Sequence, residues 1–249
     1  MQSTQPGSTD RIAISPEFVW DDQDAYLFDI DGTLMRSRDR VHYDSVAISV
    51  RRVTGFEITL AGVPIHGSTD TAILREASRQ AGIPNSVLEE HYDAILEAMR
   101  NSVAERRQEL DPVLMPGVED ALLHLAQKGA LLGVASGNLE AIGWIKIEKA
   151  GLREWFRFGG FSDLFPVRAE LIGNAAQKAR DMAGSGAKVC VVGDTPRDID
   201  AAHANSLPVI AVATGRSTFD ELLQYQPEAC VSTLANLLDH GSTKTGGAL

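Results

Sequence analysis

The chain has 249 residues, and its 34 acidic and 23 basic side chains give a net charge of −11 at pH 7 with histidine neutral. This negative surplus argues against nucleic acid as a partner, because lysine and arginine supply most of the affinity for phosphate backbones. It argues equally against an anionic membrane surface, and it leaves metal cations as partners that the charge favours. With 44% hydrophobic residues, the chain can bury a core without disulfide bonds.

Both ends of the chain are rich in small and polar residues. Residues 1–20 predict a flexible leader and residues 241–249 a flexible tail. The first residues lack the basic segment and apolar run of a signal peptide, and no apolar stretch approaches the ~20 residues of a membrane span. Two cysteines, Cys190 and Cys230, are too few for a disulfide framework. We therefore expect a cytoplasmic protein.

Short apolar runs separated by helix-sized segments predict the strands of one sheet. The segments between several of these runs carry apolar residues at three- and four-residue spacing, which predicts helices. Strands that alternate with helices favour an α/β fold with a doubly wound parallel sheet. The predicted strands are 25–30, 130–135, 156–161, 188–192, 208–213 and 229–231, and the predicted helices between them include 118–128, 138–150 and 170–183.

One interval, residues 35–115, interrupts this alternation. It shows helical patterning without strand-like runs, with turn signals between the segments. We expect an all-helical insertion there, and a core formed by residues 21–34 and 116–240. The candidate helices of the insertion are 42–52, 70–81, 86–92 and 94–109.

Two carboxylates stand at the end of the first apolar run. Asp29 and Asp31 are separated by one residue and precede Gly32. Ligands of open α/β sheets bind at the carboxyl ends of the strands, so these acids lie where chemistry is expected. A divalent cation would keep both neighbouring carboxylates ionised, and a carboxylate can also be a nucleophile that forms an acyl phosphate. A simple turn is the alternative, since Asp, Gly and Thr all favour turns.

The segment Asp29-Ile30-Asp31-Gly32-Thr33 resembles the first motif of the haloacid dehalogenase superfamily, whose phosphatases carry D-x-D-x-[TV]. The helical insertion occupies the place of the C1 cap, and residues 63–70 resemble the cap loop of phosphoglycolate phosphatase-like members. The resemblance implies a Rossmann-like core with an inserted cap. It also implies Mg²⁺-dependent hydrolysis of a small phosphate monoester, with Asp29 as the nucleophile that forms an aspartyl-phosphate and Asp31 as general acid and base.

The predicted strand 130–135 ends at Ser136, Gly137 and Asn138. These residues precede a predicted helix, whose first backbone N–H groups favour an anion. The segment resembles the second motif of the superfamily, which implies that Ser136 bonds the phosphoryl group and that Gly137 and Asn138 belong to the phosphate-binding loop. A helix-capping role for Ser136 or Asn138 is the alternative.

A further acidic pair follows the predicted strand 188–192. Asp194 and Asp198 resemble the fourth motif of the superfamily in its G-D-x-x-x-D form. The resemblance implies Mg²⁺ held by Asp29, the backbone carbonyl of Asp31 and Asp194, because Mg²⁺ prefers a few carboxylates with water and phosphate. Asp198 is expected to support these ligands from behind, or to cap the following helix.

The third motif departs from the superfamily pattern. A lysine, or less often an arginine, is expected at the start of the helix before the fourth motif, and only Arg168 stands there. Arginine stays charged and can bind phosphate through two parallel hydrogen bonds, so it can fill this role. Lys178, inside the same predicted helix, is the alternative, and a solvated surface position for Arg168 is another.

Other activities remain as alternatives. A 2-haloacid dehalogenase has no use for Asp31 or Mg²⁺, and a phosphonoacetaldehyde hydrolase needs a cap lysine, whereas the first lysine of this chain is Lys128. A sugar phosphomutase of the β-phosphoglucomutase type shares the motifs but usually carries Glu-Asp where this chain has Gly193-Asp194. A non-catalytic module that binds phosphorylated ligands is the last alternative. The presence of every expected catalytic residue type favours an enzyme.

The identity of the substrate depends on the cap. His66, Arg75 and Arg79 lie near the expected cap loop and are candidates to face a second anionic group, such as a carboxylate, although a solvated helix surface is the alternative. The resemblance suggests phosphoglycolate as the phosphate monoester. No sequence feature indicates an oligomeric state.

Overall fold

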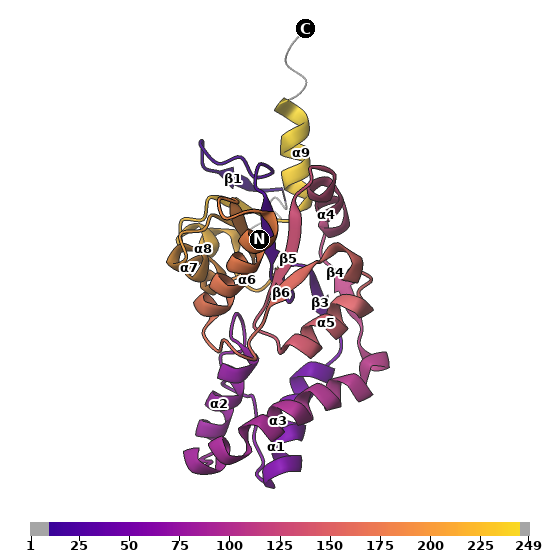
Figure 1. The fold of residues 1–249 in the computed structure, drawn as a ribbon. Coiled ribbons are helices and arrows are strands. Elements are labelled where there is room, and N and C mark those ends of the chain that lie inside the picture. The colour runs from indigo at the N-terminus through magenta and orange to yellow at the C-terminus, as the bar shows by residue number, and fades with distance from the viewer. Residues whose placement is uncertain (1–9, 245–249) are drawn as a thin grey trace, which may run out of the picture.

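The computed structural model describes residues 10–244 of the chain, and within them seven strands form one sheet in the order β1-β9-β8-β7-β2-β5-β6 (Figure 1). Neighbouring strands are parallel except β1, which runs antiparallel to β9. The strands are β1 (Ile12–Ile14), β2 (Ala25–Phe28), β5 (Leu131–Ala135), β6 (Phe158–Gly160), β7 (Val189–Gly193), β8 (Val209–Val212) and β9 (Ala229–Val231). The predicted α/β fold with a parallel sheet is confirmed.

Helices cover both faces of this sheet. Along β2, Tyr26 and Phe28 face one apolar layer with α4 and α9, whereas Ala25 and Leu27 face the opposite layer with α6, α7 and α8. Successive strand residues point to opposite faces, so burial of both faces explains why these runs are continuously apolar. The core helices are α4 (Val118–Gln127), α5 (Glu140–Lys149), α6 (Arg168–Ala183), α7 (Pro196–Ala204), α8 (Phe219–Leu223) and α9 (Ala235–Lys244), with a short 3₁₀ turn η2 (Arg153–Trp155).

The insertion forms a separate helical layer below the core in Figure 1. It contains α1 (Val41–Thr54), α2 (Asp70–Gln80), α3 (Asn85–Glu105) and the 3₁₀ turn η1 (Arg107–Glu109). The predicted helices 86–92 and 94–109 are largely one helix, α3, because no glycine or proline interrupts the chain between them. Leu139 and Ile142 of the core join the apolar cluster of the cap, so the cap packs on this part of the core.

The two connections between cap and core contain strands that the sequence patterning did not predict. β3 (Met35–Ser37) and β4 (Pro112–Leu114) pair antiparallel, with Met35 opposite Leu114. Three-residue strands are too short for a periodic signal, which explains the omission. The cap is therefore helical apart from this two-stranded connection.

The predicted leader and tail are wrong in part. Ile12–Ile14 forms β1 on the open edge of β9, and Trp20 is buried against the core, where its ring stacks on His124 at 5.2 Å between centroids. This segment is ordered by tertiary pairing with an edge strand, which composition does not register. Residues 241–244 belong to α9, while 1–9 and 245–249 lie outside the described residues.

None of the helices in residues 10–244 combines the length and apolarity that crossing a bilayer requires.

Candidate active site

The three predicted catalytic loops meet because their strands are neighbours in the sheet. β2 lies between β7 and β5, with Phe28 level with Val192 on one side and Val134 on the other. Asp29 directly follows β2, Ser136 follows β5 and Asp194 follows β7. The site therefore lies at the carboxyl edge of the central strands, where ligands bind in open α/β sheets.

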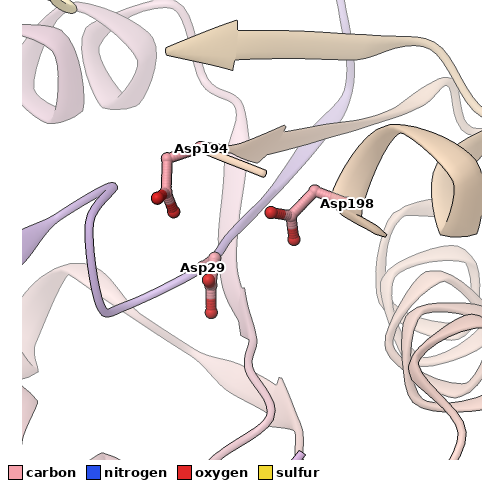
Figure 2. A group of neighbouring side chains, drawn as sticks. All are labelled: Asp29, Asp194 and Asp198. Atoms are coloured by element: carbon pink, nitrogen blue, oxygen red, sulfur yellow. The ribbon is translucent and has the colours of Figure 1, made fainter. Parts of the chain in front are cut away.

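Three buried carboxylates gather at this edge. Carboxylate oxygens of Asp29, Asp194 and Asp198 all lie within 4.8 Å of one another. Figure 2 shows the side chains of Asp194 and Asp198 facing each other, with Asp29 beside them. Burial raises the pKa of Asp29 to about 6. The charge of Arg168 makes this rise smaller, and the charges of Asp198 and Asp31 make it larger. Burial and the repulsion of Asp198 and Asp29 raise the pKa of Asp194 to about 8.

This donor set fits a divalent cation. Hard oxygen ligands at short separation are what Mg²⁺ prefers, and a cation here would relieve the repulsion that raises both pKa values. The side chain of Asp31 does not belong to the three-carboxylate cluster. That arrangement is compatible with the expected ligand at this position, which is the backbone carbonyl of Asp31 rather than its carboxylate.

The turn after β2 brings its backbone against Asp194. Gly32 has φ of +95°, and a Cβ atom there would lie 2.3 Å from Asp194 Oδ2, so only glycine fits. The hydroxyl of Thr33 donates to Asp194 Oδ1 at 3.1 Å. The D-x-D-G-T pattern is therefore a tertiary requirement of the site as well as a local turn.

Arg168, at the first position of α6, is buried among the acids. Its Nη2 lies 2.8 Å from Asp29 Oδ2 and 2.6 Å from Asp198 Oδ1, and its Nε donates to Asp198 Oδ1 at 2.8 Å. Within residues 10–244, no acceptor is aligned with the N–H directions of Nη2. Lys178 instead donates to the carbonyl oxygen of Gly159 at 2.7 Å. Of the two candidates for the third motif, the structure brings Arg168 to the acids.

Asp198 has two structural roles at once. Its Oδ1 receives Arg168, while its Oδ2 accepts hydrogen bonds from the backbone N–H of Thr195 at 3.0 Å and from its hydroxyl at 2.6 Å. The second set belongs to the capping box of α7. Both oxygens are thus engaged within the protein, and the structure shows Asp198 in the helix cap that was one of its two expected roles.

The loop after β5 lies under the cap. Asn138 Nδ2 donates to Ser136 Oγ at 2.8 Å, and the backbone N–H of Ser136 is used in the sheet, where it donates to Gly160. A Cβ atom on Gly137 would lie 2.5 Å from the carbonyl oxygen of Ser68 in the cap loop. Gly137 therefore allows the cap loop to contact the expected phosphate-binding loop directly.

Asp31 contacts a lysine that sequence reasoning missed. Lys146, on α5, places Nζ 2.7 Å from Asp31 Oδ2 and 2.9 Å from Asn138 Oδ1, and Asn138 Nδ2 donates to Asp31 Oδ2 at 2.9 Å. Partial loss of water contact beside the cavity wall raises the pKa of Asp31, but Lys146, His42 and Asn138 outweigh this effect, and the pKa lies below its usual value. The sequence feature that could have revealed Lys146 is its position within the apolar stripe formed by Ile142 and Ile147, where a charged residue is unexpected.

A second missed pair comes from the cap. His42 Nε2 lies 3.0 Å from Asp70 Oδ2, and the same oxygen accepts the backbone N–H of Leu139 at 2.8 Å. Asp70 is buried at the start of α2, and His42 and Asp31 both line the cavity. Only the packing of α1 against the core loop brings these residues together, so no local pattern could have revealed them.

Cap and core enclose a cavity of about 670 Å³ that contains the carboxylates of Asp29 and Asp31 in its lining. His66 also lines it, and burial together with the nearby Arg216 lowers the pKa of His66. Arg75 and Arg79 do not line it, since they form ion pairs on the cap surface with Glu89 and Glu76 respectively. The cationic side chains that line the cavity are Arg36, Arg40, Lys146, Arg168 and Arg216.

Comparisons with known proteins agree with this architecture. A phosphoglycolate phosphatase of Mesorhizobium japonicum is 31% identical over 117 residues, which are 47% of this chain and 51% of that enzyme. A phosphoglycolate phosphatase of Synechococcus elongatus is 27% identical over 86% of this chain and 95% of its own length. The crystal structure of a predicted phosphatase from Clostridium acetobutylicum has a TM-score of 0.65 at 20% identity, covering 89% of this chain and 99% of the other.

The sequence profile of haloacid dehalogenase-like hydrolases matches residues 23–205, which include the loops after β2, β5 and β7, the start of α6 and the helical insertion. The same span contains Asp29, Asp194, Asp198 and Arg168, whose side chains converge in the structure. The chain belongs to the haloacid dehalogenase-like hydrolase family.

Proposed function

We propose that this protein is a Mg²⁺-dependent phosphatase that hydrolyses a small phosphate monoester through an aspartyl-phosphate on Asp29. The observation that carries the proposal is the buried guanidinium of Arg168 beside the carboxylate of Asp29, at the floor of a cavity between cap and core. An arginine held against the nucleophile can bind the oxygens of a phosphoryl group as it approaches that nucleophile. Relatives that bear the name phosphoglycolate phosphatase support the same reaction class.

In the first half of the reaction, a carboxylate oxygen of Asp29 attacks phosphorus in line with the ester oxygen. The new bond joins Asp29 to phosphorus, and the ester P–O bond breaks with its electron pair on the leaving oxygen. Arg168 and Ser136 contact the equatorial phosphoryl oxygens, where negative charge spreads in the transition state. Bound Mg²⁺, held by Asp29, Asp194 and the carbonyl of Asp31, would screen repulsion between the nucleophile and the phosphate.

Asp31 moves the protons. It passes a proton to the leaving oxygen in the first half, and in the second half it takes one from the water that attacks the aspartyl-phosphate. Because Lys146, His42 and Asn138 keep the pKa of Asp31 low in the free enzyme, the first proton enters with the substrate, whose phosphate has a second pKa of about 6, and passes through Asp31 to the leaving oxygen. After the second half, Asp31 gives the proton that it took from the water to the departing inorganic phosphate, and Asp29 and Asp31 are both ionised again.

The cavity favours a substrate with a second polar or anionic group. His66 and Arg216 line the cavity together, and Arg36 approaches it from the connection between cap and core. The guanidinium groups of Arg216 and Arg36 attract a second anion, for which phosphoglycolate is the simplest example by similarity. Arg75 and Arg79, which pair with glutamates outside the cavity, take no part in this proposal.

The test compares the wild type with Asp29→Asn on a panel of phosphate monoesters, with and without Mg²⁺. Asparagine keeps the shape but is no nucleophile, so we expect turnover to fall by about a thousandfold or more and the phosphoenzyme to be lost. Release of inorganic phosphate distinguishes hydrolysis from a mutase, which would return the phosphoryl group to a sugar. Undiminished turnover in a folded Asp29→Asn variant would overturn the assignment.

A further inference from the structure

Lys146 is unusual for its position. Although its side chain is charged, only 4% of it is exposed, and it lies on α5 among the buried residues Ile142, Gly143 and Ile147. A buried ammonium is costly unless it is paired, and an apolar side chain of similar volume at such a place is often at least as stable. The helix therefore carries a charge that packing alone does not require, at the point where it faces Asp31.

The contacts of Lys146 define the orientation of two other side chains. An ammonium has three donors and no acceptor, so Lys146 can meet Asn138 only at Oδ1. That contact turns the amide of Asn138 so that Nδ2 donates to Asp31 Oδ2 and to Ser136 Oγ. Lys146 thus acts on Asp31 directly, at 2.7 Å, and again through Asn138.

Both donors bind the same oxygen of Asp31. Oδ2 receives Lys146 and Asn138, and within residues 10–244 no hydrogen bond reaches Oδ1. The side chain of Asp31 is 43% exposed, and the residue lines the cavity beside Asp29. The carboxylate is consequently held by one oxygen while the other faces the space where phosphate and water would react.

We propose that Lys146, together with Asn138, is a positioning residue that holds Asp31 Oδ2 so that Oδ1 faces the water attacking the aspartyl-phosphate. This inference rests on the proposed function, because it assigns a partner to the residue that moves the protons. A carboxylate fixed at one oxygen need not lose rotational freedom when the water is activated. The water gives its proton to Oδ1, its oxygen forms the new bond to phosphorus, and the bond between phosphorus and Asp29 breaks.

The test separates the two halves of the reaction. Radiolabelled p-nitrophenyl phosphate is mixed with the Mg²⁺-loaded enzyme, and rapid quenching measures the formation and decay of the phosphoenzyme. The nitrophenolate leaves with little help from an acid, so Lys146→Met should slow formation by less than about tenfold. Decay, which needs the positioned carboxylate, should slow by about a hundredfold, so that phosphoenzyme accumulates and kcat falls more than kcat/KM.

Two further variants complete the comparison. Lys149→Met, on the same helix with an exposed side chain, should leave both rate constants unchanged. Lys146→Arg keeps a buried cation with several donors and should restore part of the decay rate. A phosphate-binding role for Lys146 would instead raise KM in Lys146→Met, and a merely structural role would slow both steps alike. Either result, or unchanged decay, overturns the inference.

Failure of the proposed function has a different signature. If wild-type enzyme forms no phosphoenzyme on Asp29, or if Asp29→Asn still releases phosphate, the proposed reaction is wrong whatever Lys146→Met does. If wild type forms the phosphoenzyme and Lys146→Met loses it at the wild-type rate, only the role of Lys146 is wrong.

Discussion

Arg168 compensates the charge of two buried carboxylates. It touches Asp29 and Asp198 with distances of 2.6 to 2.8 Å, and its Nη1 donates to the carbonyl of Gly67 in the cap loop at 3.2 Å. Burial lowers the pKa of Arg168, but Asp198 and Asp29 outweigh it and raise the pKa above its ordinary value. The Arg168 side chain therefore links Asp29, the cap of α7 at Asp198 and the loop before α2 at Gly67.

We predict that Arg168→Ala is much less stable than the wild type in metal-free solution. Removing one partner leaves uncompensated buried charge, which costs about 3–5 kcal/mol of unfolding free energy. Urea unfolding monitored by circular dichroism measures the difference. Lys178→Ala serves as the control, because it removes one hydrogen bond to Gly159 and should cost about 1 kcal/mol. Equal stabilities of the two variants would show that Arg168 has no such role.

Among the elements, the cap loop before α2 contacts the core loops that precede α6 and follow β5. The hydroxyl of Thr69 donates to the carbonyl of Pro166 at 2.7 Å, and the backbone N–H of Asp70 donates to Gly137 at 2.7 Å. A second contact comes from α3, where Arg100 lies 2.7 Å from Asp163, whose other oxygen accepts the backbone N–H of Glu140 at the start of α5. The cap is thus joined to the core by polar contacts at two places.

Gly137→Ala should disturb this contact without touching the carboxylates. A methyl group there would lie 2.5 Å from Ser68 O and 2.9 Å from Thr69 Cα, so the cap loop has to shift. Small displacements in an active site are expensive, and we expect kcat/KM to fall by about ten- to a hundredfold in steady-state assays. Gly186→Ala is the matched control, since its added Cβ would meet no atom within 4 Å. Similar kinetics for both variants would contradict this account.

At the scale of the whole molecule, a chain of net charge −11 concentrates several of its acids at one buried point. In metal-free protein, the pKa values of Asp29 and Asp194, about 6 and about 8, exceed those of the unfolded chain. The folded state therefore holds protons that the unfolded state has released. By linkage, these two groups make the unfolding free energy fall as the pH rises from about 4 to about 8.

Mg²⁺ should reverse this loss, and more strongly at high pH. At pH 5 the ion must displace protons from Asp29 and Asp194, whereas at pH 8 it meets fewer of them, so its affinity rises with pH. Thermal unfolding with and without Mg²⁺ at pH 5 and pH 8 measures the effect. We expect a larger increase in Tm at pH 8, corresponding to about 2.7 kcal/mol when the ion is at a hundred times its Kd. Asp194→Asn should abolish the increase, and an equal shift at both pH values would contradict the prediction.

The sequence alone determined the parts that depend on local order. Apolar runs identified six strands of the core, and helical spacing of apolar residues identified the insertion, because strand, helix and turn preferences are encoded by neighbouring residues. The ends of three of these runs gave the places of Asp29, Ser136 and Asp194. Arg168, at the start of α6, could also be identified from the sequence, because its place follows from the order of the predicted elements.

Only the tertiary structure decided which distant side chains meet. Lys146 reaches Asp31 because α5 presents that face to the loop after β2, and His42 reaches Asp70 because α1 and α2 pack over the same loop. The pairing of β1 with the edge of β9 is of the same kind. Helix rotation and edge pairing are fixed by packing between segments far apart in the chain, for which a single sequence carries no periodic signal. Local order thus located Asp29, and packing decided which side chains hold Asp31.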